Sequence, residues 1–480
     1  MMHDVPVCAP LAGDRWSVQA RPPARRRVPI GLRHEGRRVA VRLPPLSRGV
    51  LRRWTTNRVI RNASALYGTM AIGMLTTLVM VTFLSRVLGP AHWGQLILAQ
   101  ALAGWLGIAV AYGFGLGGTR AVARVREDRA ALARLASGVL GAQGLLLLAS
   151  APLPLLALGF LPPFRHHAGF VAAAWSLSIA GNAGPRWYFQ GVERMGPPSW
   201  AGSLSGVGAA CLTLLLVHRP TQALAALWIQ AGATALGTAW LFWRMYREIP
   251  WVRPGWADAM QGLRTGWSMF LFKVSVRLYT NANTLILGLF VPASLVSFYG
   301  AAEKINKQVL GLIAPISTAL FPRLSHLVQQ DPAAARHLAR LNLGLMTAFG
   351  LAAGGLVALF APLVVHVLLG PRYGSAVPLV RLLAALLPAI AVSTVLGGGW
   401  MVPLGLDRDF NRIIASAGVL NVAVAVALVH PLGDTGMALA VVSAEWFVTL
   451  SMAWVLQRRG AGLLGWTSPT VRAASLPPGG

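Results

Sequence analysis

Basic side chains deep inside two long apolar stretches are the residues of this sequence whose types and spacing best suit binding chemistry. In the first stretch, Lys273 and Arg277 lie four residues apart, and their polar stripe continues at helical spacing to Asn281. At about 1.5 Å of rise per residue from Gly266, Arg277 would lie roughly 16 Å into a helix. That depth is close to the middle of a bilayer, where a charge is costly and indicates function.

The second stretch carries Glu303, Lys304 and Lys307 to a similar depth. Lys273, Lys304 and Lys307 are the only lysines among the 42 basic residues of the chain. This placement predicts a site where compact ammonium groups bind an anion, with phosphate or pyrophosphate as the obvious class. The other interpretation is a Glu303 to Lys307 ion pair that holds two helices together, but it leaves Lys273 and Arg277 unneutralised.

Two more charged residues belong to this group of candidates. Arg186, in the segment PRWYFQGVERM, is a candidate for the same binding site, although its place late in an inward-running span also lets it reach the cytoplasm. Glu445 lies about ten residues into the last apolar stretch, which places it near mid-membrane. It is a candidate coupling site for H⁺ or Na⁺, and a simple ion-pair partner for a nearby cation is the alternative.

The sequence contains no pattern typical of catalysis or metal binding. His166 and His167 have no carboxylate or cysteine partners at suitable spacing. Cys8 and Cys211 are too few for a disulfide framework and lack metal-ligand spacing. We therefore expect a protein that is not an enzyme and that binds no cofactor and no metal.

The composition indicates where these charges must be held. The chain is 55% hydrophobic and only 12% charged, with a mean hydropathy of +0.59, whereas a soluble protein is roughly 25% charged. Its net charge of +28, taken alone, suggests a nucleic-acid partner. The arginines, however, form short clusters between long apolar runs, which is typical of loops that orient a membrane protein. The sequence thus predicts an all-α integral membrane protein, in contact with lipid and not with nucleic acid.

Apolar stretches long enough to cross a bilayer predict about twelve transmembrane helices. They follow an Arg-rich and Pro-rich segment, residues 1–60, which we interpret as a disordered basic tail in the cytoplasm or as the product of a start codon assigned too far upstream. The predicted spans are 62–84, 93–116, 135–161, 168–190, 200–217, 222–243, 266–291, 295–321, 341–369, 376–403, 409–430 and 435–456.

Arginine is distributed unevenly between the two sets of loops. One set holds Arg120, Arg124, Arg126, Arg129, Arg134, Arg244, Arg247, Arg253, Arg264, Arg323, Arg336, Arg340, Arg458 and Arg459. The other set holds little more than Arg86, Arg165, Arg219 and Arg372. Because basic residues near span ends resist translocation, the first set is expected in the cytoplasm, together with both termini.

The longest internal cytoplasmic break divides the predicted spans into two equal groups. The expected domains are an N-terminal lobe at 61–245, a linker at 246–265, a C-terminal lobe at 266–457 and a cytoplasmic tail at 458–480. Because both lobes start on the same side, any repeat between them must be parallel, with a pseudo-two-fold axis along the membrane normal. The segments LSRVLGPAHWGQ and LGLFVPASLVSFYG form a faint repeat, each with a Pro-containing turn after the first span of its lobe.

Several segments, in a constant order from residue 62 to residue 457, resemble those of a known family. They are LSRVLGPAHWG, YGFGLGGTRAVARVRED, WYFQGVERM, YTNANTLILGLFVPASLVSFYGAAEKI, PISTALFPRLSHL and PLVVHVLLGPRYGSAVPLVRLLA. In this order the sequence resembles the O-antigen and polysaccharide repeat-unit flippases of the multidrug/oligosaccharidyl-lipid/polysaccharide (MOP) exporter superfamily. The basic N-terminal segment lies outside the resemblance.

The resemblance implies two lobes of about six helices each around a central cavity, as in MATE-type transporters. It also implies a polyprenyl-pyrophosphate-linked oligosaccharide as substrate, flipped across the cytoplasmic (inner) membrane of a bacterium by alternating access, for O-antigen, lipopolysaccharide or exopolysaccharide biosynthesis. Polymerase or assembly proteins are possible partners. In this cavity the cations would hold the pyrophosphate, and Tyr279, Asn281 and Asn283 would meet sugar hydroxyls.

Two alternative functions stay open. A drug or cation antiporter of the same superfamily would need intramembrane carboxylates for a cationic substrate, whereas lysine and arginine outnumber them here. A membrane glycan ligase or polymerase would need a large outer loop with catalytic groups, and the predicted outer loops are short.

Overall fold

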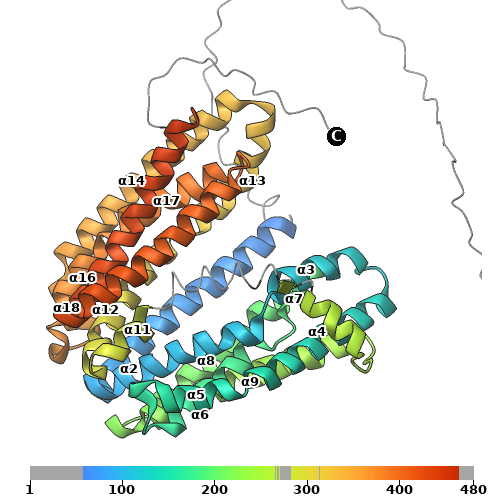
Figure 1. Cartoon of the computed structure of the whole chain (residues 1–480), viewed down its shortest axis with the longest axis horizontal. Helices are drawn as coiled ribbons and strands as arrows, with labels where there is room; N and C mark the ends of the chain where they lie inside the picture. The colour runs from blue at the N-terminus through green and yellow to red at the C-terminus, as the bar shows by residue number, and fades with distance from the viewer. Residues whose placement is uncertain (1–57, 265, 268–269, 271–282, 313, 464–480) are drawn as a thin grey trace, which may run out of the picture. The chain divides into compact units, whose positions relative to one another are not determined.

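A computed structural model describes residues 58–264, 266–267, 270, 283–312 and 314–463 of the chain (Figure 1). Within these ranges every regular element is a helix. The N-terminal segment at 1–60 lies outside them apart from its last residues, and so does most of the predicted span 266–291.

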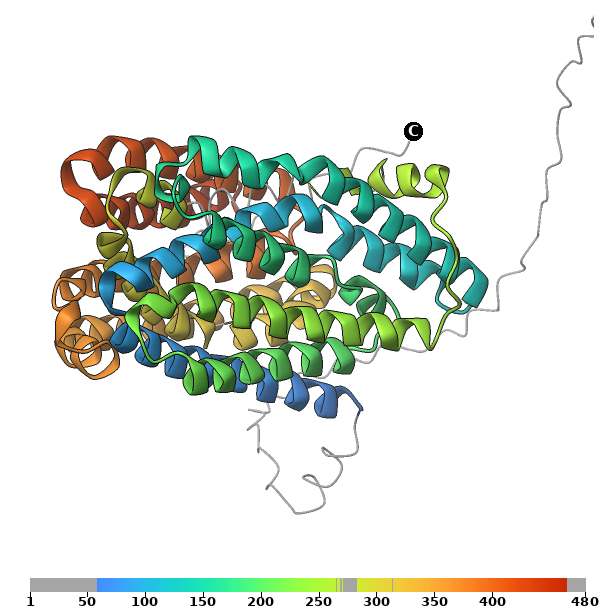
Figure 2. The same cartoon turned by 90° about the horizontal axis from the view of Figure 1, so that it is seen from below.

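In the N-terminal half, helices pack both on their neighbours in the sequence and on helices further along the chain. Residues of α6 contact both α2 and α9, and α8 packs against α9 and α2; Figures 1 and 2 show these green and blue segments side by side. The elements are α2 (Arg58–Ala111), α3 (Phe114–Val125), α4 (Arg129–Ser150), α5 (Pro152–Phe160), η1 (Pro162–Phe164), α6 (Ala168–Asn182), α7 (Arg186–Gly191), α8 (Gly196–Leu216), η2 (Pro220–Gln222) and α9 (Ala223–Tyr246).

The C-terminal half is built in the same way. There α17 packs against α14 and α18, α12 packs against α16, and α11 contacts α18. The elements are α11 (Asn283–Phe290), α12 (Ala293–Gly311), α13 (Ala314–Gln330), α14 (Pro332–Leu359), α15 (Ala361–Leu368), η3 (Pro371–Tyr373), α16 (Ala376–Ala384), α17 (Leu386–Leu396), η4 (Gly397–Met401) and α18 (Asp407–Arg458).

Seven of the described helical segments are long and apolar enough to cross a membrane. Two of them, Met70–Val125 with 56 residues and Asp407–Arg458 with 52 residues, are too long for one crossing, which needs about 20 residues. Each is interrupted by a glycine with positive φ: Gly89 (φ 70°) and Gly433 (φ 58°). Because only glycine adopts such angles readily, each break allows the chain to turn between two predicted spans.

The apolar side chains on the outside of these helices identify their solvent. Leu148 and Leu236 are 75% exposed, and Leu204 is 73% exposed. Such a surface would be unstable in water, but it is the expected surface of a helix that faces lipid tails. The described residues thus form a multi-pass membrane protein, as the composition predicted.

Close contacts of α2 with α11 and α12 join the two halves of the chain. A Cβ added at Gly94 of α2 would lie 1.7 Å from the backbone oxygen of Ala293, at the start of α12. A Cβ at Gly288 of α11 would lie 2.2 Å from Leu98 of α2. Glycine at these two positions therefore allows α11 and α12 to approach α2, and this approach brings the side chains of α12 to the N-terminal half.

Two helices that follow predicted cytoplasmic loops, α4 and α14, each begin with an aspartate as N-cap residue. The Asp128 carboxylate accepts hydrogen bonds from the backbone N–H groups of Ala130 at 2.9 Å and Ala131 at 3.0 Å. These bonds cap α4 and, with the Ala131 bond as the larger contribution, hold the pKa of Asp128 below its ordinary value. Asp331 caps α14 in the same manner.

Candidate functional site

A cavity of about 650 Å³ lies among the helices of the N-terminal half. Residues of α2, α6, α8 and α9 form most of its wall, and Lys304 of α12 joins them from the C-terminal half. Its described lining contains two cations, Lys304 and Arg186, with the amides of Gln100, Asn182 and Gln230 and several Ser and Thr hydroxyls. None of the lining residues in the described part of the chain is Asp or Glu.

Lys304 is held in the cavity wall by neutral groups. Its Nζ donates a hydrogen bond to Oε1 of Gln100 at 3.2 Å and lies 5.6 Å from the ring centroid of Trp93. Both contacts are with α2, and the Trp93 side chain is only 1% exposed. A carbonyl oxygen and the face of an indole ring both attract a cation without neutralising it. Neither of these two contacts supplies a negative charge that would pair with the ammonium.

Gln100, the hydrogen-bond partner of Lys304, is also bonded to a third helix. Nε2 of Gln100 donates to Oε1 of Gln230 on α9 at 2.9 Å. Lys304, Gln100 and Gln230 thus form a chain of hydrogen bonds from α12 through α2 to α9, and all three residues line the cavity. We name these three residues the amide chain.

Lys307 has a different environment, although it lies only three residues after Lys304. Its Nζ lies 3.0 Å from Oε1 of Glu303, and the second carboxylate oxygen of Glu303 accepts a bond from Thr284 at 3.4 Å. The Lys307 side chain is 51% exposed and that of Glu303 is 18% exposed. The structure thus contains the i,i+4 pair of the second interpretation, and Lys304 is the lysine of α12 that lines the cavity.

Arg186 lines the same cavity from another helix. It begins α7, directly after the interruption at Pro185 that separates α7 from α6, and its side chain is exposed. The structure therefore brings Arg186 and Lys304 to one cavity. An exposed position also agrees with the alternative in which Arg186 reaches the aqueous phase.

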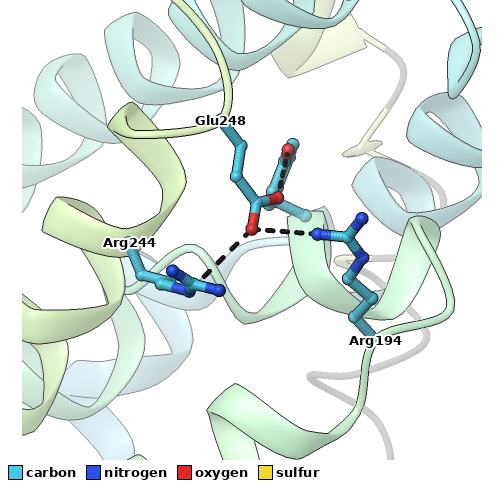
Figure 3. Close-up of polar contacts among 4 residues, drawn as sticks. Arg194, Arg244 and Glu248 are labelled. Atoms are coloured by element: carbon cyan, nitrogen blue, oxygen red, sulfur yellow. Dashed lines mark hydrogen bonds and ion pairs between the residues drawn. The ribbon is translucent and has the colours of Figure 1, made fainter.

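A carboxylate fastens the short helix α7 that carries Arg186. Oε1 of Glu248, a residue just after α9, lies 3.0 Å from Nη1 of Arg194 and 3.9 Å from Nε of Arg244 (Figure 3). Oε2 of Glu248 accepts a hydrogen bond from the Tyr188 hydroxyl at 3.1 Å. Because Tyr188 is in α7 and Arg194 follows it, this cluster ties α7 to the end of α9.

An aromatic cluster closes the wall behind Lys304. Tyr373 packs edge to face on Trp93 at 5.6 Å and on Phe298 at 5.7 Å. The Tyr373 hydroxyl also donates to the backbone oxygen of Ser85 at 3.2 Å. Since Ser85 and Trp93 belong to α2, these contacts join α2 to η3 and α12 next to the cavity.

The remaining predicted site residues are not among the described residues that line this cavity. Lys273, Arg277, Tyr279 and Asn281 lie outside the described residues. Glu445 lies in α18 and is partly buried, and its backbone oxygen accepts a bond from Thr449 at 3.0 Å. Its role in ion coupling stays a prediction.

Asn283 differs from the expectation that it meets sugar hydroxyls. Its side chain is 3% exposed, and its Oδ1 accepts a 2.7 Å bond from the fully buried Asn421 of α18. The amide is therefore used to join α11 to α18. A buried polar side chain in a membrane helix often bonds to a neighbouring helix, and this competing role explains the difference.

Gln100, Gln230 and Trp93 were not predicted from the sequence as cavity residues. The two glutamines lie inside the predicted spans 93–116 and 222–243, where an uncharged amide is itself unusual. That signal was available, although it does not say which helices the amides face.

With this geometry established, comparisons with known proteins are informative. The family model described as "Polysaccharide biosynthesis protein" matches residues 59–328. A putative O-antigen transporter of Escherichia coli (strain K12) is 25% identical over 404 residues, which cover 83% of this chain and 97% of that protein. A putative O-antigen transporter of Shigella dysenteriae is 24% identical over 379 residues, which cover 78% of this chain and 94% of that protein.

Solved structures of similar fold include a flippase and a drug transporter. The lipid II flippase MurJ in an inward closed conformation has a TM-score of 0.64 at 11% identity, over 82% of this chain and 86% of that chain. An inward-facing multidrug resistance MATE family transporter of the MOP superfamily has a TM-score of 0.63 at 18% identity, over 83% of this chain and 98% of that chain. These likenesses confirm the predicted all-α membrane fold of the MATE/MOP type.

Proposed function

Because this chain belongs to the polysaccharide biosynthesis protein family, we propose that it flips polyprenyl-pyrophosphate-linked oligosaccharide repeat units across the cytoplasmic membrane of a bacterium. Both O-antigen transporters that resemble it are matched over more than nine-tenths of their length. The product of this step would supply the biosynthesis of a surface polysaccharide. Polymerase and assembly proteins would act on the flipped lipid.

The lining of the 650 Å³ cavity is the observation that carries this proposal. Lys304 presents an ammonium whose described contacts are neutral, so a phosphate oxygen can bind it by charge and by hydrogen bonding. Arg186 gives the cavity a second cation, and the amides and hydroxyls between them suit sugar oxygens. Lys273 and Arg277 would add to the same positive field, and the lipid tail would stay in the bilayer.

A drug or cation antiporter of the same superfamily is less well supported. Its substrate would need a carboxylate in the cavity, and the described lining residues include no Asp or Glu. A glycan ligase or polymerase is also less well supported, because the relatives and the structural neighbours are transporters and flippases.

Alternating access of the two lobes, 61–245 and 266–457, is the proposed mechanism, with 246–265 as the linker and both termini in the cytoplasm. In it, the pyrophosphate binds near Lys304 while the cavity is open to the cytoplasm. The aromatic cluster of Trp93, Phe298 and Tyr373 closes the cavity wall next to that site. Release would require these contacts between α2, α12 and η3 to separate. Coupling to H⁺ or Na⁺ at Glu445 is the accompanying hypothesis.

A deletion strain tests the proposed function. Lipid-linked repeat units should accumulate in the cytoplasmic leaflet, as measured by an impermeant probe that labels only the outer leaflet, and the intact gene should restore labelling. A strain that accumulates flipped but unligated or unpolymerised glycan would instead identify a ligase or polymerase. A strain with unchanged glycan lipids but increased sensitivity to cationic drugs would identify an antiporter.

A further inference from the structure

The orientation of the amide chain follows from the chemistry of its lysine. An ammonium group has three donors and no acceptor, so the atom of Gln100 that faces Lys304 at 3.2 Å must be the carbonyl oxygen. The Nε2 of Gln100 then faces Gln230, whose Oε1 accepts at 2.9 Å. As a result, the Nε2 of Gln230 points away from Gln100.

In this orientation, the amide chain presents hydrogen-bond donors at its Gln230 end, where Nε2 of Gln230 lies. Among the described residues, no side chain or backbone oxygen accepts a hydrogen bond from Nε2 of Gln230, and Nε2 of Gln100 uses one of its two N–H groups. Lys304 uses one of three donors on Gln100, which leaves the others for a phosphate. The cavity wall thus presents ammonium donors and amide donors side by side, and both need acceptor oxygens.

The neighbours of Gln230 on α9 do not offer the same group. Thr234 and Thr238 also line the cavity, but the Thr234 hydroxyl donates to the backbone oxygen of Gln230 at 2.7 Å. The Thr238 hydroxyl donates to the backbone oxygen of Ala180 at 2.6 Å. The Thr234 and Thr238 hydroxyls thus donate within the protein, whereas Gln230, among the described residues of α9 that line the cavity, keeps amide N–H groups without a described acceptor.

We propose that Gln100 and Gln230 form a saccharide subsite beside the anion site of Lys304. It binds hydroxyl or carbonyl oxygens of the sugar that lies nearest to the phosphate, because the amide of Gln100 begins beside the anion site, with its Oε1 3.2 Å from Nζ of Lys304, and Gln230 is bonded to that amide. Gln230 is then a specificity-determining residue for the glycan, whereas Lys304 binds every substrate that carries the phosphate. The inference rests on the proposed function, since it assumes that a glycan-linked phosphate binds Lys304.

Two probes separate the saccharide subsite from the anion site. One is polyprenyl pyrophosphate without sugar, and the other is the lipid-linked repeat unit extracted from the deletion strain. Their dissociation constants are measured on the full-length protein in lipid nanodiscs. Gln230→Met should weaken binding of the repeat unit by about five- to tenfold, the effect of one or two neutral hydrogen bonds. It should change binding of the sugar-free lipid by less than about twofold.

Matched variants complete the experiment. Gln457→Met, the same substitution at an exposed residue of α18 that does not line the cavity, should change neither dissociation constant, and Lys304→Met should weaken both. If Gln230→Met lowers the melting temperature, Gln230→Asn is the second variant, because it keeps an amide but withdraws it toward α9. Equal weakening of both probes by the Gln230 variants, or no weakening of either, would overturn the subsite. Unchanged binding of both probes to Lys304→Met would instead overturn the anion site and with it the proposed function.

Discussion

Separate replacement of the two lysines of α12 should show which one contributes to substrate binding and which one contributes to the stability of the fold. Lys304 and Lys307 are three residues apart on one helix, yet Lys304 contacts Gln100 and Trp93 and Lys307 pairs with Glu303. Methionine keeps the length and apolar stem of lysine and removes the charge. Lys304→Met should therefore impair flipping and leave folding almost intact, whereas Lys307→Met should weaken the fold more than it impairs flipping.

The expected magnitudes follow from these environments. A hydrogen bond between charged groups contributes about 1.5 to 3 kcal/mol, so loss of one phosphate contact should lower affinity about 10- to 150-fold in Lys304→Met. The lost contact with Trp93, about 0.5 to 2 kcal/mol, is offset by relief of the desolvation of the ammonium. Its net effect on the free energy of unfolding should stay within about 1 kcal/mol.

Lys307→Met leaves the Glu303 carboxylate, which is 18% exposed, with Thr284 as its described partner. Breaking a fully buried pair costs about 3 to 5 kcal/mol. Because the Lys307 side chain is 51% exposed, solvent screens the pair, and a loss of about 1 to 2 kcal/mol is expected.

Purified variants in lipid nanodiscs and in proteoliposomes provide the assay. Melting temperature reports the fold, and the rate of flipping per folded molecule reports function. A Lys304→Met protein that melts well below Lys307→Met and flips substrate at the normal rate per molecule would refute the assignment. Lys304 would then be a structural residue.

The remaining predictions concern packing, the Glu248 cluster and topology. Gly94→Ala should destabilise the protein by about 1 to 3 kcal/mol, because its Cβ would overlap the backbone of Ala293; Gly144→Ala, where no atom lies within 4 Å, is the control in a melting experiment. Glu248→Gln should lower the melting temperature by the equivalent of about 1 kcal/mol, since it removes the charge shared by two partly exposed arginines. Glu193→Gln, in an exposed pair with Arg126, should have no measurable effect in the same experiment. A reporter fused after Arg459 or placed between Phe242 and Arg264 should read cytoplasmic, and one near Pro292 should read external; an external signal after Arg459 would contradict the twelve-span topology.

The approximate position of the membrane-spanning segments could be predicted from the sequence because the membrane constrains them strongly, but the helix bounds could not: the predicted spans 295–321 and 341–369 are each divided between two helices, α12 and α13 or α14 and α15. A span needs about 20 apolar residues, and a break between spans needs a residue such as Gly89 that tolerates positive φ. The i,i+4 spacing of Glu303 and Lys307 likewise needs nothing beyond the helix itself. These features depend on local sequence, and local sequence was sufficient.

Contacts between helices could not be predicted in the same way. A polar stripe shows which face of a helix avoids lipid, but it does not show whether a ligand or another helix covers that face. Asn283 was expected in the cavity and is bonded to Asn421, which is 138 residues away in the chain. Gln100 and Gln230 are separated by 130 residues. Their proximity depends on the packing of α2 against α9, which no local pattern encodes.

The contacts of Lys304 with two neutral side chains, Gln100 and Trp93, are an argument for a site that binds and releases its ligand. A carboxylate at the position of Gln100 would stabilise the ammonium strongly, and an incoming phosphate would have to displace it or bear its repulsion. A carbonyl oxygen and an indole face hold the side chain in place and leave its positive charge for the ligand. When the ligand leaves, the same two contacts would hold the ammonium again. Lys307 is paired with Glu303 and lacks this property, so we propose Lys304 as the lysine of α12 that binds the phosphate in the described cavity, while a contribution of Lys307 to substrate binding stays a prediction.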